Sequence, residues 1–194
     1  MMIIALRNAI CLIGLFLILP FLVASSIFIL IEDGFPLFFK QKRIGINKNI
    51  FTIYKIRTLK TNAPNVGTHD LEDSYKLKAG RIIRALKLDE FPQLFNVFKG
   101  DINLVGPRPG LESQIELEQA RTEAGIFIVK PGITGLAQVL GYDMSEPVTL
   151  AAIDKIYIKN KSISLDLLIL IGTFISFPRN YLASKFGVIL IKKI

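Results

Sequence analysis

Residues 9–31 read AICLIGLFLILPFLVASSIFILI, a run without a charged side chain. As a straight helix this run is roughly 34 Å long, which is enough to cross the hydrocarbon core of a bilayer. A signal peptide has a shorter apolar region that ends at a small-residue cleavage site. Here the apolar run continues past Ala24 and Ser25 to Ile31. The sequence therefore predicts an uncleaved N-terminal membrane helix.

Pro20 lies in the middle of this run, where a proline removes a backbone hydrogen bond and kinks the helix. Arg7 precedes the run, and Lys40, Lys42 and Arg43 follow it. Positive charge at both ends does not favour a simple crossing under the positive-inside tendency. Two geometries stay open from the residues alone. The kinked helix either spans the membrane, since prolines are tolerated there, or re-enters the same face.

The composition places the chain at a membrane surface. With 24 Lys and Arg against 16 Asp and Glu, the net charge of +8 attracts nucleic acid, anionic lipid or phosphorylated substrates. A chain with 51% hydrophobic residues and a mean hydropathy of +0.47 fits lipid better than nucleic acid. No nucleic-acid motif is present, and there is no Trp for base stacking. We therefore expect no nucleic-acid partner.

The single cysteine and the single histidine do not predict a metal site or a disulfide. Cys11 has no second cysteine to pair with and is interpreted as a small buried apolar residue. His69 lies in a polar stretch and is interpreted as a loop residue, because one His without Cys partners does not make a zinc site.

A basic strand follows the membrane segment. Residues 50–58, IFTIYKIRT, are rich in β-branched and aromatic residues and predict a strand with Lys55 and Arg57 on one face. The pair either lies on a solvated edge or faces a phosphate. Residues 61–79 are polar and predict a long loop, and residues 80–88 predict a short basic helix that carries Arg84.

Residues 88–94, LDEFPQL, place two acids together at the expected start of a helix. Asp89 is the expected N-cap, and Pro92 is tolerated in a first turn. Asp89 and Glu90 would then lie beside free N–H groups at a positive helix end, which is also a natural phosphate site. Read alone, the pair is better interpreted as a capping carboxylate followed by a favourable first-turn glutamate, because acids are common at helix starts.

Two rigid turns and an apolar segment complete the chain. In residues 104–110, LVGPRPG, prolines fix the backbone on both sides of Arg108. Residues 130–135, KPGITG, form a glycine-rich turn whose backbone could approach a phosphate or a nucleotide, and Thr134 within the turn and Gln138 after it are candidate substrate-binding residues. Residues 163–177 are too short to span a membrane and suit an interfacial or core helix.

In this order, the segments resemble the bacterial sugar transferase family, the monotopic phosphoglycosyl transferases. The resemblance extends over about residues 1–178 and rests on residues 39–45, 55–58, 88–94, 104–109, 131–139 and 154–166. It implies transfer of a sugar 1-phosphate from a UDP-sugar to undecaprenyl phosphate with Mg²⁺, releasing UMP. It further implies that Asp89 is the nucleophile of a covalent phosphosugar intermediate, that Glu90 is a metal ligand, and that Arg84 and Arg108 contact phosphate.

The resemblance also implies an architecture and a location. We expect an α+β, helix-rich cytosolic domain on a re-entrant helix kinked at Pro20, with amphipathic interfacial helices. The expected division is a membrane helix at 1–35, a catalytic domain at 36–178 and an apolar, basic tail at 179–194. The catalytic domain would lie on the cytoplasmic face of the inner membrane, where a second copy or downstream glycosyltransferases are candidate partners. The alternative function is a non-catalytic membrane scaffold that uses its basic face to bind lipid or an enzyme.

Two positions depart from the family pattern. Many members have a serine before the kinking proline, where this chain has Leu19. Many also read Asn-Gly-Arg where residues 140–143 here read LGYD. The missing arginine means that any nucleotide contact it makes elsewhere does not carry over to this chain.

Overall fold

The computed structural model describes residues 2–64 and 73–191, and for residues 2–8, 10 and 11 it describes the backbone alone. His69, Lys192, Lys193 and the side chain of Cys11 therefore lie outside the described residues. The described part is helix-rich with two small sheets, which confirms the α+β class. The chain forms two compact units, residues 1–41 with 52–99 and residues 42–51 with 100–194. The functional division expected at residues 35 and 178 stays a prediction.

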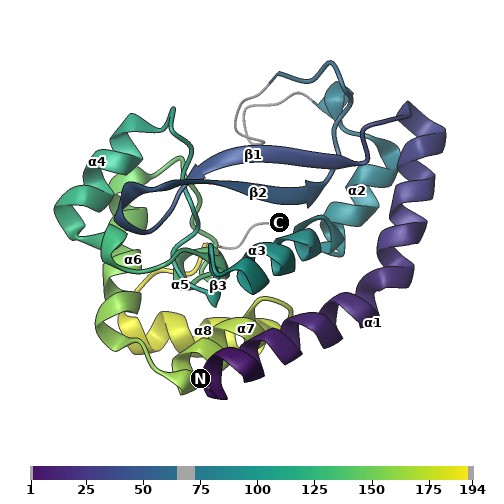
Figure 1. Ribbon diagram of the computed structural model, residues 1–194. Coiled ribbons are helices and arrows are strands. Elements are labelled where there is room, and N and C mark those ends of the chain that lie inside the picture. Colours follow the sequence, from purple (N-terminus) through teal and green to yellow (C-terminus); the bar gives the residue numbers. More distant parts are fainter. Residues whose placement is uncertain (1, 65–72, 192–194) are drawn as a thin grey trace. The chain divides into compact units, whose positions relative to one another are not determined.

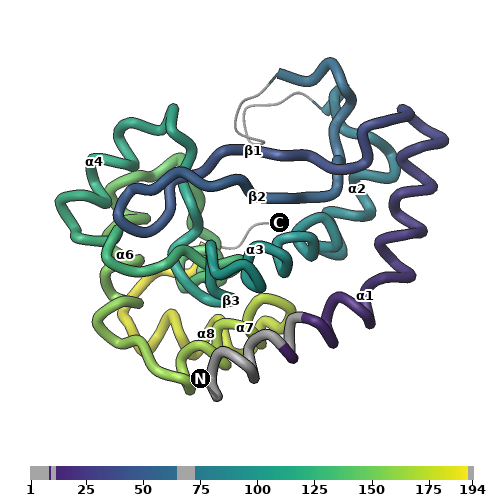
Figure 2. The backbone as a smooth tube through the Cα atoms, in the orientation of Figure 1, coloured from purple at the N-terminus to yellow at the C-terminus, as the bar shows by residue number. Residues whose placement is uncertain are grey.

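The first unit joins the N-terminal helix to most of a hairpin and to the short helices after it. Its elements are α1 (Met2–Asp33), β1 (Phe38–Ile44), β2 (Ile50–Ile56), η3 (Asp73–Tyr75), α2 (Lys78–Ala85), η4 (Leu88–Gln93) and α3 (Leu94–Lys99). β1 and β2 pair in a two-stranded sheet, and Figure 2 shows them side by side. The buried side chains of Ile29, Ile56, Leu77 and Ile83 form one apolar cluster, so α1, β2 and α2 share a core.

Helix α1 is continuous through Pro20, and Figure 1 shows it changing direction along its length. Leu12–Asp33 is long and apolar enough to cross a membrane, and only 11% of its most apolar window is buried. Phe16, Leu17 and Ile31, for example, are 66–77% exposed. The core helix of a soluble protein would be mostly buried, so this exposed apolar surface supports membrane association. Re-entry at Pro20 stays a prediction.

The second unit is built around a short parallel sheet. Its elements are η1 (Ile46–Lys48), β3 (Asn103–Val105), α4 (Ile115–Ala124), η5 (Ile126–Ile128), β4 (Gly132–Thr134), α5 (Leu136–Val139), α6 (Pro147–Asn160), α7 (Ile163–Gly172) and α8 (Ser176–Phe186). β3 pairs in parallel with β4, with Asn103 opposite Gly132 and Val105 opposite Thr134. The core of this unit includes Val105, Leu117 and Tyr157. The Tyr157 hydroxyl donates to Asp166 at 2.8 Å and lies 3.3 Å from the Val105 carbonyl oxygen.

Most expected elements are present, with shifted ends. The strand expected at 50–58 is β2, and the basic helix expected at 80–88 is α2. The apolar segment 163–177 contains α7, which begins where the Ser162 hydroxyl caps the Leu165 N–H. It breaks before α8 instead of forming one helix.

Gly132→Ala tests the close pairing of β3 with β4. A Cβ at residue 132 would lie 2.1 Å from the Gly106 nitrogen and 2.6 Å from the Val105 carbonyl carbon, so the strands would have to separate. We expect the free energy of unfolding to fall by about 3 kcal/mol, measured by thermal unfolding in detergent. Gly110→Ala is the control, because its Cβ meets only side-chain atoms at 3.4 Å or more. Equal stability of the two variants would contradict this pairing.

Candidate active site

The two adjacent acids lie in the first turn of η4, a 3₁₀-helix rather than an α-helix. The residue before this helix is Lys87, which adopts the left-handed conformation with φ 55° and ψ 21°. The expectation that Asp89 is the N-cap is therefore wrong, because the helix begins two residues earlier than the pattern indicates, with Lys87 as its N-cap. Asp89 is buried and Glu90 is half-buried. Both acids closely follow the left-handed Lys87, whose backbone conformation is strained for a lysine.

Glu90 is paired with a cation from the hairpin. The Lys55 ammonium on β2 lies 2.9 Å from Glu90 Oε1, and the two side chains are only 15% and 21% exposed. A pair this sheltered is less screened by solvent than a surface ion pair. The structure thus brings together three of the predicted site residues, namely Asp89, Glu90 and Lys55.

Asn96 fixes α3, the helix that follows the segment with the two acids, to the hairpin. Its amide donates to the Thr52 carbonyl at 2.7 Å and its side-chain oxygen accepts from the Tyr54 N–H at 3.3 Å. Asn96 is fully buried, and these bonds satisfy its amide in the core. The sequence analysis missed this residue, although a lone Asn inside the apolar stretch LFNVF was a signal.

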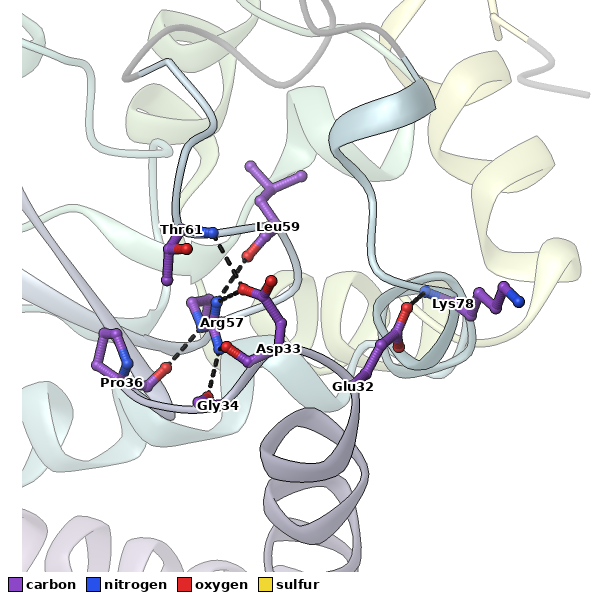
Figure 3. Close-up of polar contacts among 8 residues, drawn as sticks. All are labelled: Glu32, Asp33, Gly34, Pro36, Arg57, Leu59, Thr61 and Lys78. Atoms are coloured by element: carbon purple, nitrogen blue, oxygen red, sulfur yellow. Dashed lines mark hydrogen bonds and ion pairs between the residues drawn. The ribbon is translucent and has the colours of Figure 1, made fainter.

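Arg57 was predicted to contact phosphate, but its guanidinium is engaged inside the first unit (Figure 3). Its Nε donates to the Pro36 carbonyl at 2.6 Å, and one terminal nitrogen donates to the carbonyls of Asp33 and Gly34. The other donates to the Asp33 carboxylate and lies 3.5 Å from the Leu59 carbonyl. Because a guanidinium has five N–H donors, these contacts account for all of them. The structure therefore favours a structural role for Arg57, which is 5% exposed.

Arg84, on α2, is tied to the end of the hairpin. Its Nε donates to the Thr58 hydroxyl at 2.6 Å. Gly80, one turn earlier, lies so close to Thr58 that a Cβ would be 2.3 Å from the Thr58 carbonyl oxygen. Arg84 thus lies in the same unit as the two acids, on a helix that packs against Thr58 just after β2.

Arg108 lies in the second unit, in the turn that follows β3. Its carbonyl oxygen accepts from a terminal nitrogen of Arg121 at 2.6 Å. Arg121 also pairs with Asp154 at 2.6 Å, and both side chains are 3% exposed. Burial raises the pKa of Asp154, and the Arg121 guanidinium beside it counteracts that rise. The sequence analysis missed Arg121 and Asp154 as a pair because they lie on different helices.

Thr134 and Gln138 also lie in the second unit. The Thr134 hydroxyl is hydrogen-bonded to the Thr173 hydroxyl at 2.9 Å, which links β4 to the end of α7. The Gln138 amide donates to the Ile133 carbonyl at 3.2 Å, while its side-chain oxygen is buried and has no hydrogen-bond partner. That oxygen is a buried acceptor that the described residues leave without a donor.

The described residues contain no cluster of three or more His, Cys, Asp or Glu that could hold a metal by itself. Mg²⁺ does not need such a cluster, because it is usually held by one or two carboxylates together with substrate phosphates. Glu90 supplies a half-buried carboxylate of this kind beside Asp89. The residues present therefore fit a magnesium ion brought in with a diphosphate.

The chain belongs to the bacterial sugar transferase family, whose family model matches residues 4–180. This match covers most of the 194 residues and confirms the resemblance drawn from the motifs. All eight predicted site residues lie inside the matched region.

Individual relatives support the same family. The chain is 39% identical over 163 residues to the UDP-N-acetylgalactosamine-undecaprenyl-phosphate N-acetylgalactosaminephosphotransferase of Aeromonas hydrophila, covering 79% of this chain and 38% of that protein. It is 44% identical over 144 residues to the uncharacterized sugar transferase EpsL of Bacillus subtilis (strain 168), covering 72% and 69%. It is 37% identical over 163 residues to the UDP-glucose:undecaprenyl-phosphate glucose-1-phosphate transferase of Caulobacter vibrioides, covering 79% and 61%. Because these relatives are named as transferases, they do not favour the alternative of a non-catalytic membrane scaffold.

Asp154→Asn tests the buried ion pair of the second unit. The substitution leaves the Arg121 charge buried without its counter-charge, so we expect the free energy of unfolding to fall by about 3–5 kcal/mol. Glu118→Gln is the matched control, because it breaks the Lys48–Glu118 pair, whose side chains are 46% and 34% exposed. The control should lose less than about 1 kcal/mol in the same thermal unfolding measurement. Similar losses in both variants would contradict the assigned burial.

Proposed function

We propose that this chain transfers a sugar 1-phosphate from a UDP-sugar to polyprenyl (undecaprenyl) phosphate and releases UMP, as the first membrane step of a surface glycoconjugate pathway. The observation that carries the proposal is the Asp89–Glu90 pair, held against Lys55 in a member of the bacterial sugar transferase family. Two relatives are named for such transfers onto undecaprenyl phosphate. The exposed apolar surface of α1 suits an enzyme with a lipid substrate.

In the proposed first step, a carboxylate oxygen of Asp89 attacks the phosphorus atom that carries the sugar. The bond from that phosphorus to the bridging oxygen breaks, and its electron pair leaves with UMP. An acyl phosphate that carries the sugar then remains on Asp89. Because both reactants are anionic, the Lys55 ammonium close to the pair lowers their repulsion.

In the proposed second step, a phosphate oxygen of the polyprenyl phosphate attacks the same phosphorus atom. The bond between this phosphorus and the Asp89 oxygen breaks, which returns the carboxylate and yields a polyprenyl diphosphate sugar. Dividing the transfer into two steps lets one small site handle a soluble donor and a membrane acceptor in turn.

A magnesium ion bound with the donor would be held by Glu90 and would neutralise charge on the diphosphate. Arg84 and Arg108 are assigned to phosphate contacts. Thr134 and Gln138 are assigned to the donor, and the buried Gln138 oxygen supports this role because it needs a hydrogen-bond donor.

We place the catalytic residues on the cytoplasmic face of the inner membrane, with α1 inserted and re-entrant at Pro20. The relation of Pro20 to charge at both ends of the apolar run supports this geometry. Exposed apolar side chains on the C-terminal helices suit contact with the interface as well. Ile163 on α7 is 83% exposed, and Phe177 on α8 is 80% exposed.

Asp89→Asn tests the proposed nucleophile. An amide keeps the shape of the side chain but cannot form the acyl phosphate, so UMP release from UDP-sugars should fall by about 10⁴-fold or more. Glu116→Gln, a change of an exposed acid on α4, should leave UMP release unchanged. Mass spectrometry of the unaltered chain with a UDP-sugar should find the sugar phosphate on Asp89. Turnover retained in Asp89→Asn would rule out this mechanism.

Glu90→Gln and Lys55→Met together test whether Glu90 is a metal ligand and whether Lys55 acts through its charge. If Glu90 holds Mg²⁺, Glu90→Gln should raise the half-saturating Mg²⁺ concentration by about tenfold or more. Lys55→Met removes a charge that competes with the ion, so UMP release should slow without a higher Mg²⁺ requirement. Lys60→Met, which removes an exposed lysine just after β2, is the control. An unchanged Mg²⁺ requirement in Glu90→Gln would contradict its role.

A further inference from the structure

Two carboxylates end the membrane helix. Glu32 and Asp33 are the last residues of α1, and its last turn holds no basic residue. Negative charge at the C-terminal end of a helix is unfavourable, because the helix dipole is negative there. The stability of α1 itself therefore does not explain these two acids, and their partners lie elsewhere in the first unit.

Glu32 caps a helix that starts 46 residues later. One of its carboxylate oxygens accepts from the Lys78 N–H at 2.7 Å, and the other accepts from the Ala79 N–H at 3.0 Å (Figure 3). These are the first two N–H groups of α2, whose N-cap, Leu77, makes no side-chain cap. Glu32 thus satisfies two otherwise unpaired donors and places negative charge at the favourable end of α2.

Asp33 holds the opposite side of the same junction. Its carboxylate accepts from the Arg57 guanidinium and from the Thr61 N–H, the latter at 3.1 Å. The Arg57 fork also binds the carbonyls of Gly34 and Pro36, so it fixes the chain that leaves α1 (Figure 3). We call Glu32, Asp33 and Arg57 the α1 clamp.

The α1 clamp contacts two segments that connect to Asp89 and Glu90, namely the end of β2 and the start of α2. Arg57 directly follows β2 and is two residues beyond Lys55, which pairs with Glu90. Helix α2, capped by Glu32, ends three residues before Leu88, where η4 begins. These contacts therefore fix the end of β2 and the start of α2 relative to α1.

The paired acids also have supports that do not involve α1. Lys55 binds Glu90, and Asn96 joins α3 to β2 through Thr52 and Tyr54. Loss of the α1 clamp should therefore leave the local geometry of Asp89 and Glu90 intact. What it should loosen is their placement relative to the membrane helix.

We propose that the α1 clamp is a positioning device for the lipid-dependent step. It holds Asp89 at a fixed place relative to α1, so that the phosphosugar on Asp89 meets the acceptor phosphate at the bilayer surface. This inference rests on the proposed function. It makes Glu32, Asp33 and Arg57 positioning residues, since none of them needs to touch a reacting atom.

The test separates the two steps by using nanodiscs prepared without and with polyprenyl phosphate. The variants are Glu32→Ala, Asp33→Ala and the milder Arg57→Lys, which keeps the charge but loses the five-donor fork. Without acceptor, UMP released per enzyme in one turnover reports the first step and should change less than about twofold. With acceptor, kcat/KM for polyprenyl phosphate should fall by about tenfold to a hundredfold, as expected for a small misplacement.

A matched control and a direct readout accompany these assays. Asp73→Ala breaks the exposed Asp73–Lys76 ion pair in the same unit and should change neither step. Amide hydrogen exchange at Lys78 and Ala79 should rise by about tenfold in Glu32→Ala if the cap forms in solution.

The outcomes are distinct. A proportional loss of both steps would assign the clamp a merely structural role and overturn the inference, as would unchanged acceptor kinetics or unchanged exchange. If the unaltered chain releases no UMP from any UDP-sugar, the proposed function fails and this inference fails with it.

Discussion

The first unit depends on the buried guanidinium of Arg57. A buried charge is stable only when it is paired and when each of its N–H groups finds an acceptor. Arg57 meets this demand with the Asp33 carboxylate and with the main-chain carbonyls of Asp33, Gly34 and Pro36. Because these acceptors come from the end of α1 and the residues after it, the requirement fixes where the helix stops and how the chain enters β1.

A second buried arginine, Arg121, has a similar structural role in the second unit. Arg121 joins α4 to α6 through Asp154 and holds the carbonyl of Arg108 in the proline-flanked turn. In both units an arginine orders main chain near residues assigned to the site. The fork geometry lets one arginine bind a carboxylate and a main-chain carbonyl oxygen at the same time.

The features that could be predicted from the sequence are those that depend on local patterns. The apolar run, the β-branched strand and the basic helix were found because period and composition act within a few residues. The 3₁₀ turn after Lys87 was missed, since a left-handed lysine has no signature in the sequence. Asp33, Asn96 and Asp154 were missed because their partners lie 24 to 44 residues away, and pairing over such distances is decided by tertiary packing. Lys55 and Arg57 came from the strand pattern, whereas the roles expected for Asp89, Glu90, Arg84 and Arg108 came from the family motifs.

Lys55 in β2 and Arg57 directly after it carry the same charge but have different contacts, so charge alone could not predict their roles. Arg57 uses a five-donor fork on fixed main-chain acceptors, so moving it would leave several buried groups unpaired. Lys55 pairs with the Glu90 carboxylate through a flexible, strongly hydrated ammonium. In the proposed reaction, Glu90 must exchange that contact for a metal ion when the diphosphate arrives. A flexible lysine can turn toward an incoming phosphate, whereas an arginine whose fork is fixed on several main-chain acceptors, like Arg57, cannot. In this proposal, the unit keeps its exchangeable cation beside the acids and its fixed cation at the end of α1.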